Sequence, residues 1–155
     1  FPPSRTKAWV MHHGFDAWKE DSWLDLSTIN KFFGEQKSIG DIVEKSHLLQ
    51  SIGYQFIYEE SRRQWPHCSM SLNWCFNEPW MTAANNALLS YPCKPRPALT
   101  AVKNALRGSM FSARVTKFSF TAGEIFSPEL WLLNDTQFEQ NATVTHETAR
   151  IDDVS

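Results

Sequence analysis

The sequence lacks the features of a membrane protein and of a nucleic-acid-binding protein. No window approaches the roughly 18 uninterrupted apolar residues that a membrane-spanning helix needs. The 15 lysines and arginines are balanced by 17 aspartates and glutamates, which gives a formal net charge of −2. Phosphate backbones and anionic membrane surfaces are bound by clustered cations. We therefore expect a soluble chain with neither nucleic acid nor membrane as a partner.

Cysteine is scarce as well. Cys68, Cys75 and Cys93 are an odd number at irregular spacing, without a paired C-x-x-C. This pattern indicates neither a zinc site nor a disulfide framework, so we expect free thiols, no metal and no cofactor. The chain begins without a charged region followed by an apolar run, so no signal peptide is recognised and the compartment stays open.

Aromatic residues, in contrast, are abundant. The 155 residues include 7 Trp and 11 Phe. Such a content indicates a large buried core, a stacking surface for a planar or sugar ligand, or both. Residues 1–37 combine several of these aromatic side chains with little periodicity, and we expect an irregular loop region packed on a scaffold.

Two helices are predicted from local signals. Ser38 and Asp41 form a capping-box pattern at the start of a long amphipathic helix that extends to about Gln64. Its expected apolar stripe consists of Ile42, Leu49, Ile52, Phe56 and Ile57. A second helix is predicted from Pro97 to Arg107, because proline suits the first helical turn and Gly108 is a stop signal.

Alternating apolar and polar residues predict the strands. The run from Ser69 to Phe76 follows a helix directly, which is typical of an αβ unit in a parallel sheet or barrel. Residues 114–121 and 125–133 predict two strands joined by a turn at Ala122-Gly123, and residues 142–149 a weaker third strand. These units complete neither an eight-stranded barrel nor a sandwich, so we expect a segment of a larger protein.

The best candidate for chemistry follows the first predicted strand. Trp74, Asn77, Glu78 and Trp80 combine a carboxylate, an amide and two indoles. Glycosidases need such groups, because carboxylates protonate or attack at the anomeric centre, amides hold sugar hydroxyls, and indoles support the apolar face of a pyranose. A loop glutamate that caps the next turn, with two core indoles, is the structural alternative.

The order of several stretches resembles glycoside hydrolase family 2, in its β-mannosidase and exo-β-glucosaminidase branch. The similar stretches are residues 1–4, Trp9 to His13, residues 50–63 with their Glu-Glu-Ser-Arg-Arg ending, residues 72–80, residues 94–106 and residues 133–135. Two departures are that Glu78 replaces the family's usual Asp, and that residues 90–93 lack the usual Asp-Tyr/Gly pattern.

The resemblance implies an α/β fold in two parts. Residues 1–109 would form the C-terminal part of a TIM (β/α)8 barrel, with residues 69–76 as its last strand. Residues 110–155 would form the first strands of an immunoglobulin-like β-sandwich, with Trp131 in its core. The chain would then be a fragment whose partner is the remainder of the parent protein.

The resemblance also implies an activity and a set of roles. The parent would be a retaining exo-acting hydrolase of a β-linked glycoside or oligosaccharide, with two glutamates about 5 Å apart. Both glutamates would lie upstream of Phe1, so this segment would carry no catalytic residue. Substrate would be bound by Trp74, Asn77, Glu78 and Trp80, whereas Trp9, His12 and His13 would line the pocket rim unless the two histidines are exposed or structural.

Two other functions remain open. The chain could be a non-catalytic carbohydrate-binding or interaction module whose tryptophans stack on a glycan or a partner. It could instead belong to another barrel glycosidase with Glu78 as acid/base, which requires a second carboxylate nearby. Glu124 and Glu129 are poor candidates for that carboxylate because their segment is predicted to belong to the sandwich.

Overall fold

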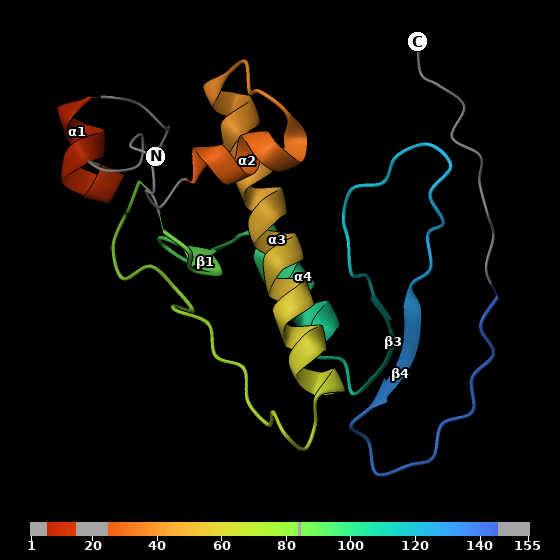
Figure 1. Cartoon of the computed structure of the whole chain (residues 1–155). Helices are drawn as coiled ribbons and strands as arrows, with labels where there is room; N and C mark the ends of the chain where they lie inside the picture. Colours follow the sequence, from red (N-terminus) through yellow and green to blue (C-terminus); the bar gives the residue numbers. More distant parts are fainter. Residues whose placement is uncertain (1–5, 15–24, 84, 146–155) are drawn as a thin grey trace.

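The computed structural model describes residues 6–14, 25–83 and 85–145 (Figure 1). In order, its elements are α1 (Lys7–Trp9), the π-helix η1 (Val10–Gly14), α2 (Leu26–Phe33), α3 (Ile39–Arg63), β1 (Leu89–Ser90), β2 (Lys94–Pro95), α4 (Pro97–Ala105), β3 (Ser109–Arg114) and β4 (Glu129–Asn134). The strands form two separate antiparallel pairs, β1 with β2 and β3 with β4. No helix in the described ranges combines the length and the apolar character that crossing a membrane requires.

The two predicted helices are confirmed. The Ser38 hydroxyl accepts a hydrogen bond of 3.1 Å from the Asp41 backbone N–H, and this cap starts α3 at the expected place. Helix α4 begins at Pro97 as predicted and ends at Ala105, two residues before the expected end.

The prediction of an irregular N-terminal region is wrong for residues 7–14, which form α1 and η1, and for residues 26–33, which form α2. The Asp25 carboxylate accepts a hydrogen bond of 3.2 Å from the Thr28 backbone N–H and so caps the start of this helix. Gly34 ends it with a φ of 76°, a conformation that glycine adopts without steric cost. The sequence contains both end signals of this helix, Asp25 at its start and Gly34 at its end. The eight residues between them are too few for a clear helical pattern of apolar positions.

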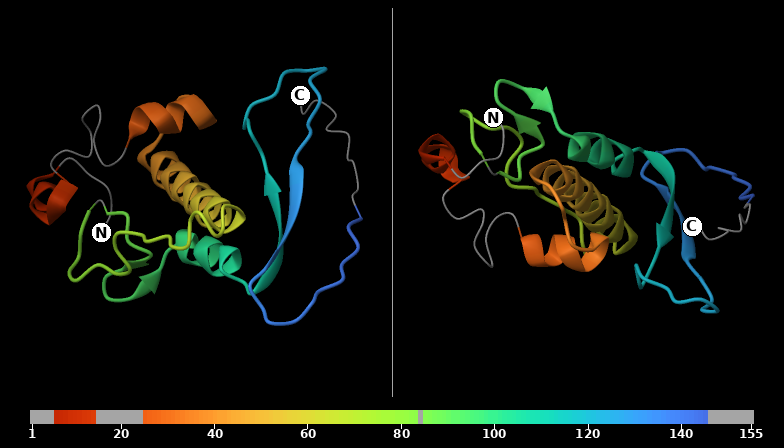
Figure 2. Two further views of the ribbon diagram at one scale, coloured as in Figure 1. Left: turned by 60° about the horizontal axis from the view of Figure 1, so that its bottom comes forward. Right: turned by 90° about the horizontal axis from the view of Figure 1, so that it is seen from above.

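The core lies between α3, α4 and the segment before β1 (Figure 2). Its buried members are Tyr58, Leu88, Ala98, Val102 and Ala105, with Tyr54 and Leu99 packed against them. The predicted apolar stripe of α3 is therefore wrong in part, because Ile52, Phe56 and Ile57 are exposed. Helix α3 turns its tyrosines toward α4, where two alanines allow the helices to approach closely.

The predicted barrel segment is contradicted. No parallel sheet occurs in the described residues, and residues 69–76 form no strand. An isolated parallel bridge joins Asn77, the next residue, to Leu89. A strand is defined by its neighbour, and residues 69–74 have no paired neighbour in the described ranges. Their polar side chains contact α3 instead: Ser71 donates to Ser61 at 2.6 Å, and Tyr58 donates to Asn73 Oδ1 at 2.9 Å.

The predicted β-hairpin is present, but its strands lie farther from the turn than expected. Gly123, with a φ of 88°, occupies the predicted turn. Residues 115–128 form a long loop in which Lys117 pairs with Glu124 at 2.6 Å and Phe120 contacts Phe126 edge-to-face. A sandwich is not formed in the described residues, because β3 pairs only with β4 and residues 142–145 form no strand. Residues 146–149 of the predicted third strand lie outside the described residues.

A buried polar network fastens the hairpin to α3. Arg63 donates to the Ser112 hydroxyl, and this hydroxyl donates to Glu59. The side chains of Arg63 and Glu59 are only 2% and 7% exposed. Because a buried charge without a partner is costly, these contacts hold β3 in one position against the helix.

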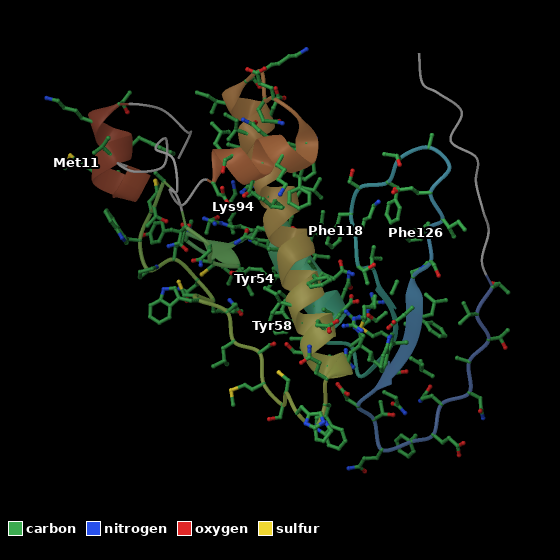
Figure 3. All side chains as sticks on the ribbon, viewed as in Figure 1. Met11, Tyr54, Tyr58, Lys94, Phe118 and Phe126 are labelled. Carbon is green, nitrogen blue, oxygen red and sulfur yellow. The ribbon has the colours of Figure 1, made fainter. Side chains whose placement is uncertain are left out.

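The hairpin loop also contacts α3 about two helical turns before Arg63, through aromatic side chains. Phe118 packs edge-on against Phe32 of α2 and Phe56 of α3, with ring centroids 6.3 and 5.9 Å apart (Figure 3). Such edge-to-face pairs are each worth about 1 kcal/mol beyond their area burial. The hairpin thus contacts α3 at two places, through the polar network at Arg63 and through the aromatic contact at Phe56.

We predict that Arg63→Met lowers the free energy of unfolding by about 3 kcal/mol, because Glu59 is then buried without its cation. The matched control Arg114→Met removes a 44% exposed arginine and should cost less than about 1 kcal/mol. Urea unfolding followed by circular dichroism measures both. Equal losses in the two variants would contradict a special role for Arg63.

A pH dependence follows from Glu60. A hydrogen bond from the Gln64 side chain, together with Arg63 and Arg114, lowers the pKa of this carboxyl below its ordinary 4.5. Its stabilising contribution is complete above that ordinary pKa and is lost as the pH falls through the lowered pKa of the folded state.

We therefore expect the unfolding free energy of the wild type to fall more steeply than that of Glu60→Gln as the pH falls below the ordinary pKa of 4.5. Urea titrations at a series of pH values give the two slopes. Parallel curves would show that Glu60 does not contribute.

Candidate functional site

Trp74 and Asn77 are exposed, whereas Glu78, one residue farther along, is buried. Trp74 is 78% exposed, and the peptide bond that joins it to Cys75 is cis. The Asn77 side chain donates a hydrogen bond of 3.4 Å to the Glu78 carbonyl. The Glu78 side chain is only 2% exposed. Of the predicted site residues, Trp74 and Asn77 are thus accessible from solvent, whereas the Glu78 carboxylate is not.

The Glu78 carboxylate is the centre of a structure that we call the Glu78 clasp, made of Glu78, Asn85, Tyr91 and Arg96. One carboxylate oxygen forms an ion pair with Arg96, and the other accepts a hydrogen bond of 3.0 Å from the Tyr91 backbone N–H. Arg96 also donates to the Asn85 carbonyl. The clasp joins three loop segments where α4 begins.

Backbone hydrogen bonds reinforce the clasp. The Glu78 N–H donates to the Leu89 carbonyl at 3.0 Å, and the Leu89 N–H donates to the Phe76 carbonyl at 2.9 Å. Arg96 N–H donates to the Leu88 carbonyl at 3.0 Å. Residues 76–78 are therefore tied to Leu88 and Leu89, and Trp74 lies just before this anchored segment.

Helix α3 holds the same region from one side. Gln50 and Tyr54 both donate to the Asn86 carbonyl at 2.8 Å, and Tyr58 reaches Asn73 (Figure 3). Gln50, Tyr54 and Tyr58 are spaced four residues apart, so they lie on one face of the helix. This face positions the loop that carries the predicted site.

Two titratable groups of α3 respond to this packing. Burial lowers the pKa of His47, and the positive charge of Arg96 lowers it further. Burial raises the pKa of the Tyr54 hydroxyl. His47 is therefore neutral, and Tyr54 remains a hydrogen-bond donor, at neutral pH.

The structure brings His12 together with Trp80, although 67 residues separate them in the sequence. Their rings stack with centroids 5.0 Å apart, and His12 Nδ1 lies 2.7 Å from the Met81 carbonyl oxygen. Because a carbonyl only accepts, Nδ1 carries the proton. Trp9 is buried and offers no exposed face. The side chain of His13 lies outside the described residues, as do residues 1–4 of the family resemblance.

The arrangement can bind a ligand by stacking, but among the described residues it offers no pair of carboxylates for acid/base work. Both oxygens of Glu78 are engaged within the clasp. Glu124 pairs with Lys117, whose hydrogen bond lowers the pKa of the Glu124 carboxyl, and Glu129 pairs with Arg114 at 3.5 Å. No group of three histidine, cysteine or acidic residues suited to a metal ion occurs in the described ranges. The three cysteines are free, as expected.

Sequence reasoning missed the residues that hold the site. Arg96 stands in Lys-Pro-Arg-Pro, a stretch that contributed to the family resemblance without a role for this arginine. The four-residue spacing of Gln50, Tyr54 and Tyr58 was the available signal for a polar-aromatic face on α3. Comparisons with protein-family models, with curated protein sequences and with solved structures found no match to this chain.

We predict that Glu78→Gln lowers the unfolding free energy by about 3 kcal/mol, because the half-buried Arg96 cation then lacks its anion. The matched control is Glu129→Gln, which removes a 58% exposed carboxylate and should cost less than about 1 kcal/mol. Hydrogen exchange by mass spectrometry should show faster exchange of the Tyr91 and Leu89 amides in Glu78→Gln only. Unchanged protection of these amides would contradict the clasp.

Proposed function

We propose that this chain is a segment of a retaining, exo-acting β-glycoside hydrolase similar to the β-mannosidase branch of family 2. Its contribution is a sugar-contacting surface at Trp74 and Asn77. The two catalytic glutamates come from other parts of the parent protein, because no glutamate of this sequence stands at the family's catalytic positions. The substrate is a β-linked glycoside or oligosaccharide.

The exposed Trp74 indole beside the clasp is the observation that carries this proposal. Because the indole is 78% exposed, most of its ring surface is open to a ligand or a partner. Its apolar face suits the axial C–H groups of a pyranose, and the Asn77 amide can hold a hydroxyl. Anchored loops on both sides keep the indole in place, which limits the ordering cost of binding.

The Glu78 clasp supports a binding role over a catalytic one. An acid/base catalyst must reach the glycosidic oxygen, and the Glu78 side chain is buried against Arg96. Its role here is to position the segment that presents Trp74 and Asn77. This geometry speaks against the alternative in which Glu78 is the acid/base of another glycosidase.

The test uses two proteins, the 155-residue chain and the longest polypeptide that its gene encodes. We expect the longer polypeptide to hydrolyse p-nitrophenyl β-mannoside or β-glucosaminide, and the chain alone to hydrolyse neither. In the longer polypeptide, Trp74→Ala should lower kcat/KM at least about tenfold, because a stacking contact worth about 1.4 kcal/mol is lost.

The matched control is Phe138→Ala, which removes a 75% exposed aromatic ring that belongs to neither surface and should leave kcat/KM unchanged. Hydrolysis by the chain alone that disappears in Glu78→Gln would assign the chemistry to Glu78 and overturn the proposal. A longer polypeptide without activity on any β-glycoside would overturn it as well.

A second candidate is a non-catalytic carbohydrate-binding or interaction module. It is favoured by a row of exposed apolar side chains at alternate positions of one extended segment, namely Met70, Leu72, Trp74 and Phe76. This candidate predicts binding of oligosaccharide or of a protein partner without turnover in any version of the polypeptide. Turnover by the longer polypeptide distinguishes the two candidates.

A further inference from the structure

A cleft whose lining does not include Trp74 lies at the junction between the helices and the hairpin. It has a volume of about 770 Å³ and is formed by the C-terminal end of α3, residues 65–71 and β4. Trp65, which is 72% exposed, and Trp131, which is 39% exposed, both line it. The expectation of Trp131 as a core residue is thus wrong, because no second sheet covers it in the described residues.

Arg62 lines this cleft with hydrogen-bonding groups that are only partly used. Its Nη1 donates to the Ala105 carbonyl at 2.5 Å, and its Nη2 forms an ion pair with Asp135 Oδ2 at 2.8 Å. Within the described part of the chain, Nε and Nη2 are buried without an aligned hydrogen-bond acceptor. Buried donors without acceptors are rare and point to a missing water or ligand.

The charged side chains of the cleft form ion pairs with one another, and this pairing favours a neutral ligand over an anion. Asp135 neutralises Arg62, and Glu59 and Glu60 neutralise Arg63. A phosphate or carboxylate ligand near Arg62 would meet the Asp135 carboxylate and be repelled. A hydroxyl group satisfies both residues, because its oxygen accepts from the arginine while its hydrogen is donated to the aspartate.

We propose that this cleft binds a neutral saccharide. The two indoles provide flat apolar faces, Arg62 and Asp135 provide a donor and an acceptor for hydroxyl groups, and Ser61, Ser69 and Thr136 add further hydroxyls to the lining. The volume lies within the usual range for ligand sites, roughly 300–1,000 Å³. This site needs no catalytic group and is independent of the proposed hydrolase activity.

The experiment titrates the 155-residue chain with neutral disaccharides and follows binding by calorimetry and tryptophan fluorescence. The probes are mannobiose, cellobiose and N,N′-diacetylchitobiose, with glucuronic acid and inorganic phosphate as anionic comparisons. We expect at least one neutral disaccharide to bind and neither anion to do so. Trp131→Ala should raise the Kd at least about tenfold, whereas Trp131→Phe should raise it less than about threefold.

Matched variants separate this cleft from the surface at Trp74. Trp74→Ala should leave the Kd for the bound disaccharide unchanged, and Arg62→Met should raise it at least about tenfold. Far-ultraviolet circular dichroism checks that each variant is folded, and Trp131→Ala, with Trp131→Phe as its conservative control, tests the cleft even if Arg62→Met does not fold.

Three results would overturn the proposal. They are no binding of any neutral disaccharide, binding that is lost only in Trp74→Ala, and tighter binding of the anions than of the sugars. Because Trp74 and Trp131 are probed separately, failure of this site and failure of the proposed function are distinguishable.

Discussion

The two consecutive arginines at the end of α3 determine how the rest of the molecule is arranged. Arg63 is buried with Glu59 and Ser112, and this contact places β3 against the helix. Arg62 turns the other way, to the end of α4 and to Asp135 just after β4. Because buried charges must keep their partners, the helix pair and the hairpin have one relative position. The cleft lined by Trp65 and Trp131 exists as a consequence of that position.

The Glu78 clasp applies the same principle at the other end of the core. Arg96 withdraws the Glu78 carboxylate from water, and the chain on either side is held by backbone hydrogen bonds and by the tyrosines of α3. Trp74 remains exposed on this anchored segment. A carboxylate that looked like a candidate for chemistry thus acts as a positioning group, and the neighbouring indole remains the group available to a ligand.

The accuracy of the sequence predictions depended on how local each signal was. Ser38 and Asp41 lie within one helical turn of each other, and Pro97 acts within its own turn, so both helix starts were predictable. The strand predicted for residues 69–76 failed, because alternation alone supplies no neighbouring strand. Ile52 and Phe56 were assigned to a buried stripe, although the tyrosines of the same helix face α4.

The sequence by itself determined where α3 and α4 begin, the turn at Gly123 and the near-neutral charge, because each depends on composition or on residues a few positions apart. Only the tertiary structure decided that Glu78 meets Arg96, that Arg63 meets Ser112 and that Trp131 faces a cleft. Those pairings join segments from 18 to more than 60 residues apart. Such contacts form only when packing of the helices brings the two side chains within hydrogen-bonding or van der Waals distance. No pattern among residues that are neighbours in the sequence specifies which distant side chains meet.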